Sequence, residues 1–275
     1  MTHVRRALRA LLLLALAAPA ARAQTDFYNT DRGRPLTTED AIVVERRAFE
    51  LQAAPLTFQR VMRGVSHWGI APELAWGFAP RTQIEVALPI AVEDDGTRPQ
   101  ALVAVAGLEV ELLHQLNTET MSLPALALGA GVHLPVGALA PSRAIPTVRA
   151  LATRTLPWGR VHINGNYSPG DDLEVSDPGA AEATRWQAGL AIDHTFVLRS
   201  LLVGAEVVAQ SPLIADGLTE WRTAIGLRQQ LSPRLAMDAG IGRRLSEGEA
   251  GWTFTMGAAY AFAPPGMPGF NRGAR

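Results

Sequence analysis

Hydrophobic and polar positions alternate along much of the chain with a period of two residues. In the stretch TQIEVALPIAVE, residues 82–93, the apolar side chains share one face, at Ile84, Val86, Leu88, Ile90 and Val92. The polar side chains Gln83, Glu85 and Glu93 take the other face. This period is typical of a β-strand with one wet and one dry side. A single strand does not show whether its dry side meets a protein core or lipid.

Twelve segments of this kind follow one another, separated by turn signals. They begin near Phe49, Gly69, Gln83, Leu102, Ala125, Thr147, Val161, Trp186, Leu201, Trp221, Leu235 and Trp252. Single-chain bacterial outer-membrane barrels have an even number of strands. Pro55 interrupts the first segment and predicts a bulge there. The sequence therefore predicts an all-β fold, a transmembrane antiparallel β-barrel of about 12 strands over residues 47–262.

The connections between the segments alternate in length. FAPR, LNTETMS, PWG, VLRS and LSPR are mostly short, whereas RVMRGVSH, EDDGTRPQ, GALAPSRA, QSPLIADGLTE, LSEGEAG and the stretch around residues 168–185 are longer. Short and long loops at opposite ends, with both termini at the short-loop end, are expected of an outer-membrane barrel with periplasmic termini. A soluble β-sandwich, the alternative, has no reason to sort its loops in this way.

Aromatic residues form two groups, as a barrel with two lipid interfaces requires. Trp68, Trp186, Trp221 and Trp252 stand at the long-loop ends of their segments. Trp76, Phe78, Trp158, Phe196, Tyr260 and Phe262 stand near the short-loop ends. The last segment, GWTFTMGAAYAF, ends on an aromatic residue like the terminal strand by which such barrels are recognised for insertion.

The two ends of the chain predict export. Residues 1–23 place Arg5, Arg6 and Arg9 before an apolar run and end on a small-x-small pattern, which is typical of a secretory signal peptide. Residues 24–46 are then expected to be a periplasmic N-terminal segment, and residues 263–275 a periplasmic C-terminal tail. Within the N-terminal segment, TTED at residues 37–40 resembles a helix-capping box. A short helix partly plugging the barrel and an extended lead-in to the first strand are both compatible with it.

Composition narrows the function classes. Without residues 1–23, the 25 basic residues of the chain become 21 against 26 acidic ones, a net charge of −5. A nucleic-acid partner is therefore not expected. The chain has no cysteine, which excludes a disulfide framework.

Several stretches resemble one family of exported proteins. RPLTTEDAIVVERRAFELQ, GIAPELAWGFAPRTQIEVALPI, PALALGAGVHLPVG and LRQQLSPRLAMDAGIGRRLS are similar to the family named for the meta pathway of phenol degradation. The resemblance covers most of the chain after residue 23. It implies an outer-membrane β-barrel transporter, and it extends to hydrophobic or aromatic solutes if the family's phenol connection holds here.

The face opposite the apolar one supplies candidate residues for a solute path. They are Glu73, Glu85, Glu109, Glu111, Arg149, His162, Asn164, Asn166, Asp193, Glu206, Arg222, Arg228 and Asp238. Charges ringing a water-filled pore set its ion selectivity. Alternatively, they pair across a packed interior, as in small barrels.

The histidines raise two chemical alternatives, a hydrolytic site and a zinc site. His162, Asn164, Asn166 and Ser168 share one face, but the serine spacing and the following Asn-Gly of outer-membrane phospholipases are missing, so a polar lumen row is the expectation. The histidines do not cluster as zinc ligands would. No catalytic residue, metal or cofactor is expected.

The sequence as a whole predicts an outer-membrane channel for passive uptake of small solutes. A closed structural or adhesion barrel is the first alternative, and a lipid-modifying enzyme is the second. The expected partners are outer-membrane lipid and lipopolysaccharide, the barrel assembly machinery and a small-molecule solute.

Overall fold

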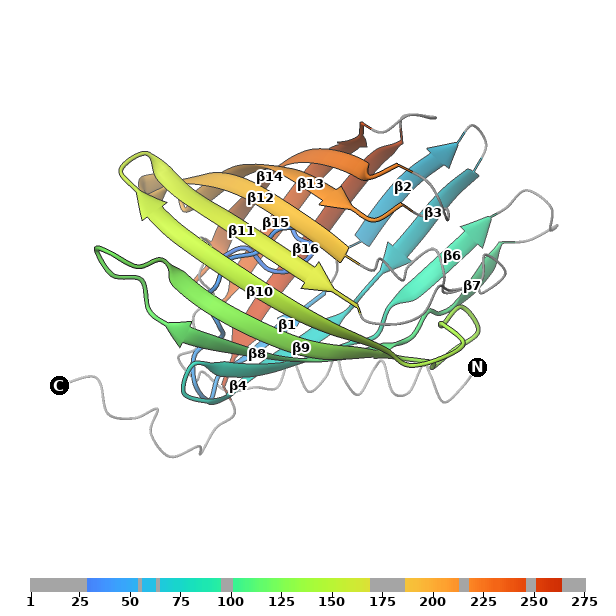
Figure 1. Ribbon diagram of the computed structural model, residues 1–275, viewed down its shortest axis with the longest axis horizontal. Helices are drawn as coiled ribbons and strands as arrows, with labels where there is room; N and C mark the ends of the chain where they lie inside the picture. Colours follow the sequence, from blue (N-terminus) through green and yellow to red (C-terminus); the bar gives the residue numbers. More distant parts are fainter. Residues whose placement is uncertain are drawn as a thin grey trace.

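The computed structural model describes residues 29–53, 56–62, 65–94, 101–168, 186–212, 218–245 and 251–263. The predicted signal peptide and nearly all of the predicted C-terminal tail lie outside these residues. The described chain forms a closed antiparallel β-barrel (Figure 1). Among the described residues there is no helix with the length and hydrophobicity that a membrane crossing requires.

The barrel contains sixteen hydrogen-bonded segments in its described part. In chain order they are β1 (Phe49–Gln52), β2 (Leu56–Met62), β3 (Val65–Ile70), β4 (Glu73–Ala79), β5 (Thr82–Ala87), β6 (Ile90–Asp94), β7 (Leu102–Val105), β8 (Leu108–Asn117), β9 (Ala125–Leu134), β10 (Ile145–Leu156), β11 (Gly159–Tyr167), β12 (Trp186–Phe196), β13 (Leu201–Gln210), β14 (Glu220–Ser232), β15 (Leu235–Arg244) and β16 (Trp252–Phe262). A single 3-10 turn, η1 (Val197–Arg199), joins β12 to β13.

The wall nevertheless has twelve strands, because the first four strands are each divided into two segments, β1 with β2, β3 with β4, β5 with β6 and β7 with β8. The ring closes through β16, which pairs with β1 near one end and with β2 farther along. On its other side β1 pairs with β4. The predicted antiparallel barrel of about twelve strands is confirmed.

Breaks in neighbouring strands lie side by side. Pro72 and Pro89 lack the N–H that a ladder needs. The Leu88 N–H donates to the Pro72 carbonyl (3.0 Å), and the Ala106 N–H donates to the Pro89 carbonyl (2.8 Å). At the next break Gly107 has a φ of 135°, and a Cβ there would collide with the His133 ring. The hydrogen-bond ladder is therefore interrupted along one line across adjacent strands.

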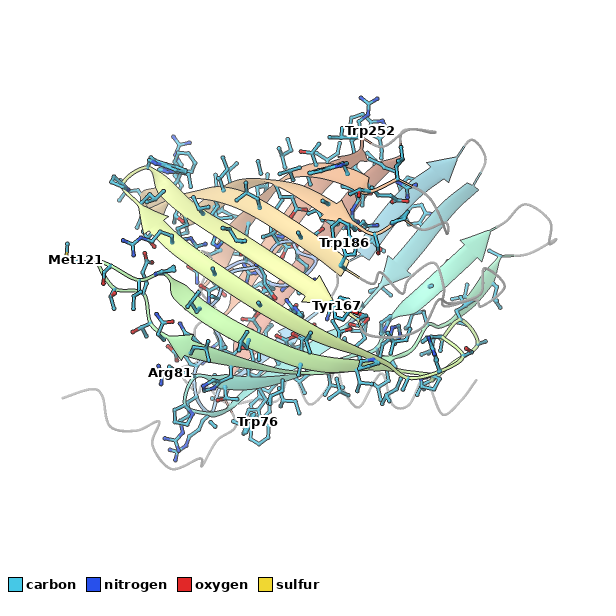
Figure 2. The ribbon with its side chains drawn as sticks, viewed as in Figure 1. Trp76, Arg81, Met121, Tyr167, Trp186 and Trp252 are labelled. Carbon is cyan, nitrogen blue, oxygen red and sulfur yellow. The ribbon has the colours of Figure 1, made fainter. Side chains whose placement is uncertain are left out.

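The outer face of the barrel is apolar and aromatic at both ends (Figure 2). Along β9, Leu126 and Leu128 point outward while Ala125 and Ala127 are buried. At the short-loop end Phe49 stacks on Trp76 and on Phe262, with ring centroids 5.5 Å apart in each pair. At the long-loop end Phe58 packs against Trp68 (4.5 Å). These are the amphipathic rings expected at two lipid interfaces.

Leu88 tests the lipid-facing assignment. It is exposed on the outer face between β5 and β6, so Leu88→Arg is expected to cost about 2–4 kcal/mol in a bilayer. The matched control is Leu198→Arg, since Leu198 is fully exposed on η1 beyond the strands. Folding yield into lipid vesicles should fall for Leu88→Arg alone. Equal yields for the two variants would contradict the assigned face.

Candidate functional site

Residues 29–48 run largely inside the barrel, and we call them the plug (Figure 1). The Thr30 N–H donates to Asp40 Oδ2 (3.1 Å), and the Asp40 N–H donates to the Thr30 carbonyl (3.3 Å). The plug is therefore a loop that turns back on itself. Asn29 and Thr30 line the same cavity near the short-loop end as Ala48, which leads into β1. Both arms of the loop thus begin at that end of the barrel.

Neither interpretation of TTED describes the segment fully, because residues 37–46 form no helix and yet residues 37–44 lie inside the barrel instead of leading straight into β1. The N–H groups of Thr37 and Thr38 donate to the two carboxylate oxygens of Glu206 on β13 (2.9 and 2.8 Å). The Glu39 N–H donates to Asn164 Oδ1 on β11 (2.8 Å). The wall thus satisfies the backbone donors that a helix or capping box would have used. In the described part of the expected periplasmic segment, residues 29–44 lie in the lumen, and the exposed residues Glu45 and Arg46 follow where Arg46 pairs with Gly77 of β4.

The first anchor of the plug is a group of buried charges on β14 and β15. Arg228 and Asp238 are cross-strand neighbours and are almost fully buried. Arg34 Nη1 donates to Asp238 Oδ2 (2.9 Å) and Arg34 Nη2 to Asp31 Oδ2 (2.7 Å). Arg228 also binds Asp31. Burial favours the neutral form of Asp31, but Arg228 and Arg34 outweigh it and hold the pKa of that carboxyl below its usual value.

The second anchor lies on the other side of the lumen. Arg149 on β10 binds both Glu39 of the plug and Glu111 of β8. Arg32 of the plug spans two carboxylates of β8, with Nη1 3.1 Å from Glu111 Oε2 and Nη2 3.2 Å from Glu109 Oε2. A guanidinium is suited to this task because its N–H groups form a rigid fork.

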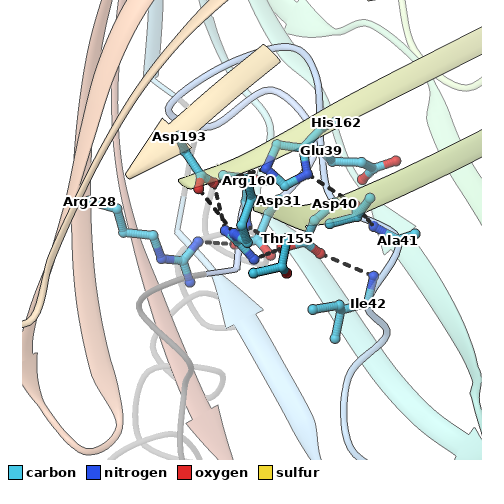
Figure 3. Close-up of polar contacts among 12 residues, drawn as sticks. Asp31, Glu39, Asp40, Ala41, Ile42, Thr155, Arg160, His162, Asp193 and Arg228 are labelled. Atoms are coloured by element: carbon cyan, nitrogen blue, oxygen red, sulfur yellow. Dashed lines mark hydrogen bonds and ion pairs between the residues drawn. The ribbon is translucent and has the colours of Figure 1, made fainter. Parts of the chain in front are cut away.

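The third anchor joins Asp40 to β11 and β12 (Figure 3). Arg160 Nη1 donates to Asp40 Oδ2 (3.2 Å), and Arg160 Nη2 donates to Asp193 Oδ2 (2.6 Å). Burial raises the pKa of Asp40, and the Arg160 guanidinium opposes that rise. Arg160 therefore ties the plug to the wall through two carboxylates.

His162 belongs to the same anchor. Its Nε2 lies 2.9 Å from Asp193 Oδ2 and its Nδ1 lies 3.0 Å from Thr153 Oγ1. This order of hydroxyl, imidazole and carboxylate resembles a hydrolytic triad. The Thr153 hydroxyl, however, is buried and accepts the Ala41 N–H (2.9 Å) of the plug. In this structure Thr153 binds the plug directly, Asp193 binds it through Arg160, and His162 connects the two.

Ser168 is not part of that arrangement. Its hydroxyl lies 2.8 Å from Thr147 Oγ1, whereas the hydrogen bonds of His162 go to Thr153 and Asp193. In the described residues there is no cluster of three or more metal-ligating side chains.

All thirteen candidate side chains predicted for the lumen are buried or half-buried and lie on the inner face of the wall. The structure brings nine of them to the plug or to its anchors: Glu109, Glu111, Arg149, His162, Asn164, Asp193, Glu206, Arg228 and Asp238. The other four, Glu73, Glu85, Asn166 and Arg222, line the lumen beside them. Their role in a solute path stays a prediction.

Sequence reasoning missed other interior side chains of the wall, namely Glu50, Thr153, Arg160, Gln187 and Gln210. Gln83 was predicted on the polar face, but its contact with the plug was missed. Arg160 stands two residues before His162 and therefore shares its face. The alternation of side chains could have identified it. Thr153 is the cross-strand partner of His162. That pairing depends on the register between β10 and β11, which the sequence pattern leaves open.

Lumen charges are unevenly distributed around the wall. Among the described side chains, the acidic residues Glu50, Glu73, Glu85, Glu109 and Glu111 project from β1, β4, β5 and β8. The interior arginines of the wall lie on β10, β11, β14 and β15, at Arg149, Arg160, Arg222, Arg228 and Arg244. The half of the wall that comes first in the chain is therefore the more acidic one.

Two cavities lie on opposite sides of the plug. A cavity of about 340 Å³, which we call the vestibule, lies toward the long loops and is lined by residues that include Arg32, Glu109, His133 and Asn166. A smaller one of about 50 Å³ lies between the plug and the strands at the short-loop end. In the described structure the plug separates the two.

Comparison with known proteins supports the fold. No family model matches the chain, and no curated protein matches its sequence. Three solved structures are similar: the COG4313 outer membrane channel from Pseudomonas putida F1 (12% identity, 85% of this chain and 100% of that one, TM-score 0.55), the KdgM porin (12%, 78% and 99%, 0.52) and the NanC porin (6%, 77% and 98%, 0.53).

At these identities the likeness shows the fold alone. The chain therefore has the fold of outer-membrane porin-like channels. The resemblance to the phenol-degradation family and the class of solute stay predictions.

Proposed function

We propose that the chain is an outer-membrane channel for passive passage of small solutes, closed by its own plug and opened when the plug withdraws. The observation that carries this proposal is the shape of the plug. Because both of its arms begin at the short-loop end, it can leave the lumen as a loop, without threading a chain end through the barrel. Withdrawal would join the vestibule to the opposite mouth.

The bonds that hold the plug suit reversible seating. They are hydrogen bonds and ion pairs between plug and wall, such as Thr38 to Glu206, Arg34 to Asp238 and Asp40 to Arg160. Water and solute ions are able to replace such partners one by one. Apolar contacts, such as that of Ala41 with Leu113 and Leu151, contribute to the seating of the plug as well. The aromatic solutes implied by the family resemblance remain part of the proposal.

A second candidate function is a closed structural barrel. The complete burial of Arg34 and Arg228 favours it, because a buried ion pair is costly to open. The two functions differ in whether the plug must move, so a lock on the plug distinguishes them.

A designed disulfide supplies that lock. A Cβ built at Gly189 would lie 3.5 Å from the Thr38 Cβ, within the separation of about 3.5–4.5 Å found in disulfides. The chain has no other cysteine, so Thr38→Cys with Gly189→Cys forms a single bond. We expect the reduced protein to show stepwise current in a planar bilayer, the oxidised protein to lose it, and a reductant to restore it.

Each single-cysteine variant under the same oxidant is the control. Equal current in the oxidised and reduced double variant would show that solutes pass without plug movement and would overturn the gate. Silence in both states, together with silence after removal of the plug, would establish the closed structural barrel instead.

A further inference from the structure

Arg32 differs from the other arginines that bind the plug to the wall. Its side chain is 41% exposed, whereas those of Arg34 and Arg149 are 0% and 3% exposed. It lies at the boundary between the plug and the vestibule, and it lines that cavity. Arg32 is thus a plug side chain that a solute in the vestibule can reach.

The carboxylates that hold Arg32 face the vestibule as well. Glu109 is partly exposed, and both Glu109 and Glu111 line the cavity. Each gives one oxygen to a different nitrogen of the same guanidinium, at 3.2 and 3.1 Å. The pair therefore binds a planar cation through two of its nitrogens, and in this structure that cation belongs to the chain itself, while the other oxygen of Glu111 binds Arg149.

The rest of the vestibule offers an apolar strip and hydroxyl groups. Ala71, Pro89 and Ile145 contribute apolar surface, and Thr147 and Ser168 contribute hydroxyls. A volume of about 340 Å³ is in the range of small-molecule sites. The lining combines a planar cation site with room for a compact apolar body.

The charge of the surrounding wall decides between cationic and anionic solutes. Glu73 and Glu85 project from β4 and β5 beside the Glu109 and Glu111 pair, so the wall behind Arg32 is acidic. An anion approaching Arg32 would meet these carboxylates. A cation would meet the same partners that Arg32 now occupies.

We propose that Glu109 and Glu111 form a binding site for small organic cations with a planar amidinium or guanidinium head, and that Arg32 occupies this site as a tethered competitor. A solute cation that takes the place of Arg32 removes one anchor of the plug. The release of the plug by a cation rests on the proposed channel function, whereas cation binding by Glu109 and Glu111 is testable without that function.

A tethered competitor makes an unusual prediction about affinity. A side chain held beside its site acts at an effective concentration in the millimolar range or above, and it weakens the apparent affinity of a free ligand accordingly. Arg32→Gln should therefore bind the cation more tightly, by at least about tenfold, although it removes a residue of the site. Glu109→Gln should weaken binding by a similar factor.

Three probes of nearly equal shape separate charge from size: benzamidine is a cation, benzamide is neutral and benzoate is an anion. We would titrate each into the folded full barrel in detergent by calorimetry, with Arg154→Gln as the control. Arg154 is a matched arginine at the short-loop end, bound to the carbonyls of Thr120 and Met121. We expect benzamidine alone to bind, more tightly to Arg32→Gln and unchanged to Arg154→Gln. Weaker or equal binding to Arg32→Gln, or a preference for benzoate, would overturn the site.

A cysteine on the plug reports whether cation binding is coupled to movement of the plug. Thr38 is buried and its hydroxyl has no hydrogen-bond partner among the described residues, so Thr38→Cys breaks no hydrogen bond seen for that side chain. Benzamidine should accelerate labelling of this cysteine by a hydrophilic maleimide, and benzamide should not. Binding without acceleration would overturn the coupling and leave the cation site standing. Failure of the channel itself would appear separately, in the disulfide-lock experiment.

Discussion

Removal of plug residues 30–41 is expected to convert a barrel that is closed for most of the time into one that conducts ions continuously. The wall has twelve strands, and a barrel of this size keeps an interior that side chains of its own wall do not fill completely. Current through a planar bilayer should rise from brief or absent openings to a steady step for each inserted molecule.

The open state should also prefer cations. Removing the plug takes Arg32 away from Glu109 and Glu111 of β8, so the acidic side from β1 to β8 loses that cationic partner. Under a salt gradient, the reversal potential should therefore have the sign expected of a cation-selective pore. Unheated gel migration and strand content by circular dichroism check that the shortened chain still forms a barrel. A folded shortened barrel that carries no current would contradict the plug as the barrier.

Arg228→Ala is expected to have the largest effect of any single wall substitution. Arg228 is fully buried, binds Asp31 of the plug and lies 4.0 Å from Glu50. Breaking a buried pair by removal of one partner costs up to about 3–5 kcal/mol, and here Asp31 would keep only Arg34 as a partner. The plug relieves this cost by moving Asp31 into water, so the substitution should favour the open state.

The rate of maleimide labelling at Thr38→Cys measures this effect, and it should rise strongly when Arg228→Ala is added. Arg154→Ala is the control, since a partly exposed ion pair such as that of Arg154 with Glu119 contributes at most about 1 kcal/mol. The effect of Asp31→Asn and Arg228→Ala together on the labelling rate should be smaller than the sum of the two single effects, because the two side chains interact directly. Additive effects would show that Arg228 does not act through Asp31.

The barrel wall was predictable because its signal is local. Alternation of side chains along β9 or β12 needs no knowledge of other strands, and the same period placed all thirteen candidate residues on the inner face. The breaks at Pro72 and Pro89 were less visible, since a proline divides a strand only where its missing N–H would have met a neighbour.

The plug was not predictable in the same way. Residues 31–46 carry charges of both signs without a period, and nothing local shows what those charges meet. The partner of Arg34 is Asp238, 204 residues farther along the chain. The pattern TTED was compatible with a capped helix and with an extended lead-in, whereas its backbone donors actually bind Glu206 and Asn164 of the wall.

The long sequence separation within the first anchor has a consequence for biogenesis. Asp31 precedes all the described strands, but its partner Arg228 lies 197 residues later, on β14. The seat of the plug is complete only after β14 and β15 have joined the wall. The first anchor therefore cannot form before these late strands are in place, whereas the second and third anchors need only β8 to β12.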